Sequence, residues 1–233
     1  RGVSFDFRTK ADDKHKARWN RAFAIGSLVA AMSQGWMLGA YVSGFREDWW
    51  TWAFNAVIAL TVPAAYVVLG AGWLIMKAEG ELHDKLRGWI NNTIICFIIC
   101  YAVTTMATLL YVPHMAARLR ANPWLFSIAV VNMLAIANIP REISLRRDGR
   151  AFISSCVAMA ALMGLFGLEM YPNLVFSNPD PAQSLNIHNA SSSTKTLGIM
   201  LTIALIGVPI VLAYTVSIYW IFRGKVKLDR MSY

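Results

Sequence analysis

Ionisable side chains inside long apolar segments are the first candidates for chemistry in this sequence. Glu169 is the only carboxylate within such a segment, Ala151–Val175. An acid in this setting relays protons, binds a polar head group, or faces interfacial water. Because Glu169 lies three residues before Pro172, we predict a polar site near the outer surface of a membrane, and we favour a carboxylate that faces interfacial water.

Cysteine and histidine residues form no recognisable metal or redox motif. Cys96 and Cys100 are one helical turn apart, but no His or Cys stands at ligand spacing near them. Haem inside a membrane takes axial ligands, usually His or Met, from the surrounding helices. The histidines all fall away from the centres of the apolar segments; they are His15, His83, His114 and His188. We therefore predict that this chain alone binds no haem and no other cofactor or metal.

Membrane-spanning helices must position these side chains. The 233 residues are 57% hydrophobic and only 15% charged, whereas soluble domains are about 25% charged. Six stretches reach the length of about 20 mainly apolar residues that a helical span needs. They are Ala22–Phe45, Trp49–Met76, Trp89–Val112, Pro123–Pro140, Ala151–Val175 and Leu197–Phe222. We predict an all-α polytopic membrane protein whose transmembrane domain, residues 22–222, is built as helical bundles.

The distribution of positive charge predicts the orientation of the spans. Of the 22 Lys and Arg residues, 18 fall in four alternate segments: the leader 1–21, 77–88, 141–150 and the tail 223–233. The positive-inside rule places these segments in the cytoplasm, with both ends of the chain. A spread of charge over alternate loops also argues against a nucleic-acid partner, which would need one basic stripe.

Prolines within two of the spans leave a transporter as an alternative. Pro63 and Pro209 fall near the middle of their segments, and broken helices in transporters expose backbone groups to a substrate. A proline more often bends a packed helix, and no paired central charges accompany these two. A secondary transporter or permease subunit and a non-enzymatic membrane scaffold both stay open at this point.

The second apolar segment ends abruptly in a patch of mixed charge. In "GWLIMKAEGELHDK" the uncharged run stops at Met76, and six of the next nine residues are ionisable. Glu81 and Lys85 are four residues apart in the order that supports a helix. We predict a helical exit from the membrane at Lys77, Gly80 and Glu81, in which Glu81 makes a buried capping or interhelical contact.

This exit resembles that of a middle span in subunit II of cytochrome bd-type quinol oxidases, which carries an apolar-Met-(Lys/Arg)-x-x-Gly-Glu-Leu pattern. The segment from "YPNLVFSNPDPAQ" to "IFRGKVKL", Tyr171–Leu228, is similar to the last outer loop and final span of that subunit. The leader "RGVSFDFRTK" and "WNRAFAIGSLVAAMSQGWMLGA" resemble the segment after its third span. The three matches cover most of the chain in the expected order.

The resemblance implies a subunit with nine spans, of which we expect the first three to precede Arg1. It implies a partner subunit I that carries b-type and d-type haems and a quinol site near the outer face. The complex oxidises quinol and reduces oxygen to water in the bacterial cytoplasmic (inner) membrane, taking up protons from the cytoplasm. This separates charge and generates a proton gradient. The resemblance leaves open whether a small accessory subunit joins the complex.

A charged cluster in the leader gives a further candidate site. Arg1, Asp6 and Arg8 stand at the cytoplasmic end expected for the third span. We expect them to anchor subunit I or to border a proton entrance, with an ordinary positive-inside cluster as the alternative.

Overall fold

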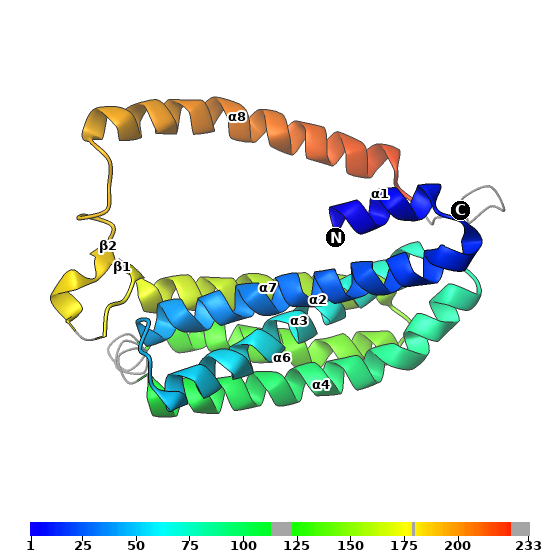
Figure 1. Cartoon of the computed structure of the whole chain (residues 1–233), viewed down its shortest axis with the longest axis horizontal. Coiled ribbons are helices and arrows are strands. Elements are labelled where there is room, and N and C mark those ends of the chain that lie inside the picture. The colour runs from blue at the N-terminus through cyan, green and yellow to red at the C-terminus, as the bar shows by residue number, and fades with distance from the viewer. Residues whose placement is uncertain (113–122, 179, 225–233) are drawn as a thin grey trace.

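Seven α-helices and one small β-hairpin make up the part of the chain described by this computed structural model, which is residues 1–112, 123–178 and 180–224 (Figure 1). Six of the helices are long and apolar enough to cross a membrane, which confirms the predicted fold class. The helices are α1 (Gly2–Lys10), α2 (Asp13–Ser43), α3 (Trp49–Lys77), α4 (Glu81–Tyr111), α6 (Leu125–Ser144), α7 (Asp148–Met170) and α8 (Thr194–Ile221).

Five helices form a bundle around α3, which contacts α2, α4 and α7, while α6 packs along α7 (Figure 1). The main core lies between α3, α4, α6 and α7 and includes Ile75, Ile90, Ile94 and Ile139, each almost fully buried. A smaller apolar cluster of Val42, Phe54, Val112 and Met170 closes the opposite end. The bundle thus buries a core of its own within the described residues.

Two glycines allow α2 and α3 to approach closely. Gly35 and Gly39 are four residues apart on α2 and both are buried. A Cβ atom at Gly35 would lie 2.6 Å from the Ile58 carbonyl oxygen, and one at Gly39 would lie 2.9 Å from Asn55 Cα. This is the small-xxx-small packing that brings helix backbones together in membranes.

Most helices extend beyond the apolar stretches that predicted them. The helix predicted from Ala22 begins at Asp13, and the helix predicted from Trp89 begins at Glu81. An apolar count marks the part that lies in lipid, whereas backbone hydrogen bonding continues into the charged interface. Residues 1–21, predicted only as a leader, contain α1 and the first turns of α2.

One prediction was wrong at the end of the fifth span. The helix expected to reach Val175 ends at Met170, since Pro172 has no N–H to continue the ladder. The following residues form β1 (Asn173–Val175), which pairs antiparallel with β2 (Leu185–Asn186) around the 3₁₀ turn η1 (Pro181–Gln183). This hairpin lies at the end of the bundle, between α7 and α8 (Figure 1).

The last helix, α8, stands apart from the bundle (Figure 1). None of its residues is buried against the described part of the chain, and its side chains are apolar on all sides. Pro209 lies inside α8 and Pro63 inside α3, and each of these helices is continuous. Neither proline therefore opens a helix in the way that the transporter alternative requires.

Candidate functional site

A cavity of about 300 Å³ lies between α2, α3, α4, α6 and α7 and opens to the surface beside the exposed side chains of Tyr66, Leu109 and Met163. Its wall is mainly apolar and includes Phe54, Phe97 and Phe166. The polar groups on this wall are Thr61, Tyr101, Thr104, Thr105, Thr108 and Glu169. Such a space admits a small apolar molecule or the tail of an amphiphile, with polar groups available along one side.

Hydrogen bonds between helices run beside this cavity. The Thr61 and Thr104 hydroxyl oxygens lie 2.6 Å apart, which joins α3 to α4. Asn132, with no exposed surface, donates from Nδ2 to the Tyr101 hydroxyl at 3.0 Å, which joins α6 to α4. Such bonds hold membrane helices in register because lipid offers no alternative partners.

Glu169 lies in the last turn of α7, where its half-buried side chain lines the cavity. The sequence favoured a carboxylate that faces interfacial water, and the structure adds that the half-buried Glu169 side chain lines the open cavity. From this position a carboxyl group accepts a hydrogen bond or exchanges a proton with a molecule in the cavity.

The leader residues Arg1, Asp6 and Arg8 do not all face one way. Arg8 donates from Nε to Asn20 Oδ1 at 2.6 Å, and the Arg1 guanidinium lies over the Phe23 ring, 5.2 Å from its centre. Both arginines thus attach α1 to α2, whereas the Asp6 side chain is exposed. Positions 6 and 8 of a helix point in different directions, so sequence proximity alone did not place them together.

The exit motif links α3 to the end of α8. Lys77 Nζ donates to the carbonyl oxygens of Phe222 at 3.1 Å and Gly224 at 3.0 Å, and it lies over the Trp73 ring. Gly80 precedes α4 with φ 67°, a backbone conformation that favours glycine. The predicted buried contact of Glu81 is wrong: Glu81 is exposed in the first turn of α4, where the helix dipole favours an acid.

A polar cluster that was not predicted from the sequence lies where α4 and α7 begin, near the exit motif. Arg87 Nη2 donates to Asp148 Oδ1 and to the Ile143 carbonyl oxygen, both at 2.9 Å, and His83 Nε2 lies 3.7 Å from Asp148 Oδ2. Glu142 is only 5% exposed, and its Oε2 has no hydrogen-bond partner among the described residues. The His83–Arg87 spacing of four residues was the available signal, but Asp148 is 61 residues further along the chain than Arg87.

The described histidines lie at helix ends and in a loop. His15 and His83 lie near the first turns of α2 and α4, His188 lies in the loop after β2, and none of these three lines the cavity. His114 lies outside the described residues. No group of three or more His, Cys, Asp or Glu side chains is placed to hold a metal ion in residues 1–112, 123–178 and 180–224.

Comparison with known proteins identifies the family. Residues 1–222 match the family described as cytochrome bd terminal oxidase subunit II. The chain is 25% identical to the cytochrome bd-I ubiquinol oxidase subunit 2 of Escherichia coli (strain K12), over 97% of this chain and 70% of that protein. It is 26% identical to a probable cytochrome oxidase subunit 2 of Haemophilus influenzae, with the same coverage of both chains.

A third relative comes from a different bacterial group. The cytochrome bd ubiquinol oxidase subunit 2 of Bacillus subtilis (strain 168) is 25% identical, over 97% of this chain and 69% of that protein. These matches confirm the resemblance found in the exit motif and in the final span, and they favour an oxidase subunit over the transporter and scaffold alternatives. The chain therefore belongs to the cytochrome bd terminal oxidase subunit II family, and it is a multi-pass inner-membrane subunit of a quinol oxidase complex.

Proposed function

We propose that this chain supports a haem-bearing subunit I and ligates no haem itself. The observation that carries the proposal is the placement of His15, His83 and His188 at helix ends or in a loop, away from the bundle centre. Haem in a membrane subunit needs axial ligands from within the helices that surround it. The partner then holds the b-type and d-type haems and the quinol site, while the complex oxidises quinol and reduces oxygen to water.

The role of this chain in that complex is to present a fixed helical surface in the bilayer. The close packing of α2 on α3 and the bonds of Thr61 and Asn132 support a rigid bundle. The exposed apolar surface of α8 is accommodated by lipid or by a neighbouring subunit. Proton uptake for water formation from the cytoplasm then separates charge across the membrane and generates the proton gradient.

The proposed sidedness has both ends of this chain in the cytoplasm. It is supported by the excess of Lys and Arg in the leader, the α3–α4 and α6–α7 connections and the tail. On this basis Glu169 lies toward the outer face. Arg1, Asp6 and Arg8 lie at the cytoplasmic face, where we propose that α1 contacts subunit I through the side that includes Asp6. Lys77, Gly80 and Glu81 form a structural exit from the membrane at the same face.

The experiment uses the purified complex with alanine replacing His15, His83, His114 and His188, singly and together. We expect haem content and the reduced-minus-oxidised spectrum to match those of the unmodified complex, with quinol-dependent oxygen uptake retained. Asp6→Asn serves as a separate probe of subunit contact, measured as the yield of intact complex. Loss of a haem band in a histidine variant that still assembles would show that this chain supplies an axial ligand.

A further inference from the structure

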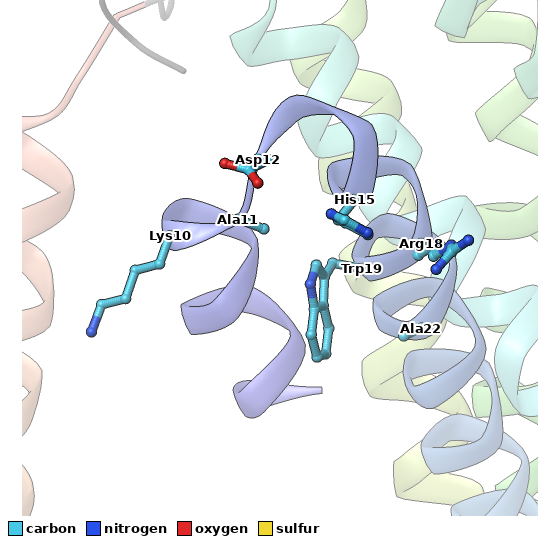
Figure 2. A pocket seen from close by; sticks show the side chains of 7 residues that line it. All are labelled: Lys10, Ala11, Asp12, His15, Arg18, Trp19 and Ala22. Atoms are coloured by element: carbon cyan, nitrogen blue, oxygen red, sulfur yellow. The ribbon is translucent and has the colours of Figure 1, made fainter.

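The turn between α1 and α2 forms an open pocket of about 520 Å³. Figure 2 shows Lys10 and Asp12 from the end of α1 and the turn, and His15, Arg18 and Trp19 from the first turns of α2. We call this the elbow pocket. It lies on the part of the molecule that the sequence assigns to the cytoplasmic face.

Three contacts between α1 and α2 hold the elbow pocket in shape. The Phe7 ring stacks on the Trp19 ring, with centres 5.4 Å apart and planes 23° apart. Arg8 is bonded to Asn20, and Arg1 lies over Phe23, one turn further along α2. The stacking of Phe7 therefore holds the Trp19 ring in place along one side of the elbow pocket.

The charge of the elbow pocket favours an anion. Lys10, His15 and Arg18 are exposed, and none of their side chains forms a hydrogen bond or ion pair with the described part of the chain. Asp12 is the acid in the pocket, and it does not cap α2 with its side chain. Residues 1–21 as a whole carry seven Lys and Arg against three Asp. Figure 2 shows the exposed Lys10 and Arg18 side chains extending to opposite sides of the pocket, so both can turn toward a phosphate group that enters between them.

The surface below the elbow pocket distinguishes a lipid from a soluble phosphate. Arg18, Ala22, Ile25 and Val29 follow the three- and four-residue spacing of one helix face. Ile25 and Val29 are 62% and 56% exposed, so an apolar stripe descends from the cationic end toward the bilayer centre. Trp19 stands at the level where tryptophan side chains gather at membrane interfaces.

We propose that the elbow pocket binds the headgroup of an anionic phospholipid, with an acyl chain along Ala22, Ile25 and Val29. Lys10 and Arg18 turn inward from the two sides of the pocket to contact the phosphate, and Trp19 packs against the glycerol region. Basic pockets at the cytoplasmic ends of membrane helices recognise such headgroups. The proposed sidedness decides which leaflet supplies the lipid. The residues and shape of the elbow pocket are the same for either orientation.

The test titrates the delipidated complex in neutral detergent with dihexanoylphosphatidylglycerol and counts bound lipid by native mass spectrometry. Lys10→Gln with Arg18→Gln is the pocket variant. Lys14→Gln with Arg21→Gln is the matched control, which removes the same charge from exposed residues of α2 outside the pocket. We expect roughly tenfold weaker binding in the pocket variant and little change in the control. Lys10→Arg with Arg18→Lys restores binding, which separates charge loss from misfolding.

Four outcomes would overturn the proposal. Equal weakening in the pocket and control variants would indicate a diffuse surface attraction. Unchanged binding in the pocket variant, at full complex yield, would place the lipid elsewhere. Displacement of the lipid by millimolar inorganic phosphate, or equal binding of dihexanoylphosphatidylcholine, would show that the pocket does not select an anionic lipid. The haem spectrum of each variant is recorded in parallel. A change in that spectrum tests the proposed function and is independent of the lipid-binding result.

Discussion

Gly39 of α2 lies so close to Asn55 of α3 that a Cβ atom on the glycine would stand 2.6 Å from Asn55 Oδ1. One turn earlier, Gly35 lies against the backbone of Ile58 and Ala59 at similar separations. The α2–α3 contact therefore depends on two positions without side chains.

Alanine at either position should loosen this contact. Gly35→Ala is expected to cost about 2 kcal/mol, because its Cβ meets backbone atoms that cannot rotate away. Gly39→Ala should cost somewhat less, since one of its neighbours is the Asn55 side chain. Thermal unfolding of the purified complex measures both. The control is Gly164→Ala in α7, where nothing lies within 4 Å of the added Cβ; stability at or above that of the unmodified complex is expected there.

Lys77 is expected to hold the end of α8 against the bundle. Lys77→Gln shortens the side chain and removes its charged hydrogen bonds to Phe222 and Gly224. Because the site is exposed, the loss should be about 1 kcal/mol, seen as roughly fivefold faster amide exchange near Tyr219–Phe222. Lys85→Gln is the control: Lys85 lies over the Trp89 ring and forms no hydrogen bond with a described residue. Equal exchange in both variants would contradict this role.

The ion pair between Arg87 and Asp148 should contribute more to stability than the other polar contacts at the end of the bundle where α4 and α7 begin. Both side chains are mostly buried, and the pair joins α4 to the start of α7. Asp148→Asn leaves the Arg87 guanidinium without its carboxylate, and we expect a loss of about 1–3 kcal/mol. Asp84→Asn, at a carboxylate that is 85% exposed, should have almost no effect. A double-mutant cycle with Arg87→Gln isolates the pair, and a coupling energy near zero would count against it.

The sequence was sufficient for the number of spans but not for their contacts. Lipid excludes polar residues over a fixed length, so Trp49–Met76 predicted α3 to within one residue. Glu142 looked like part of a loop after Pro140, yet it continues α6 and becomes buried.

Some candidate site residues could be predicted from the sequence and others could not, because side-chain contacts depend on helices that are distant in the chain. Gly80 could be recognised from a short motif because its role depends on the local backbone, whereas the bond of Lys77 to Phe222 joins residues 145 positions apart. Glu169 was found as a lone acid in an apolar run, but its place on the cavity wall depends on five helices. Arg1 and Arg8 were expected to form one cluster with Asp6, whereas packing on α2 separates their functions.

Acid should weaken the start of α3 through Asp48. Hydrogen bonds from the Thr51 side chain and backbone N–H, together with the nearby Arg46, lower the pKa of Asp48 below its ordinary value of 3.8. A lowered pKa in the folded state means that the stabilisation is complete above pH 3.8 and is lost as the pH falls through the lower, folded-state value. Asp48→Asn should reduce the acid-dependent loss of stability, measured as thermal unfolding from about pH 6 to about pH 3, without changing the haem spectrum at neutral pH. A variant with the same acid profile as the unmodified complex would argue against this cap.

Cysteine labelling tests the proposed orientation of the spans. In a background where Cys96, Cys100 and Cys156 are replaced by alanine, Ser191→Cys introduces a thiol in the loop before α8 and Ser144→Cys introduces one at the end of α6; both positions are exposed. The excess of positive charge at the Ser144 end predicts that a membrane-impermeant maleimide labels the Ser191→Cys variant in intact spheroplasts and the Ser144→Cys variant only after permeabilisation. Denatured samples provide the full-labelling control. The reverse pattern would invert the topology, and with it the leaflet assigned to the elbow pocket and the outer position assigned to Glu169.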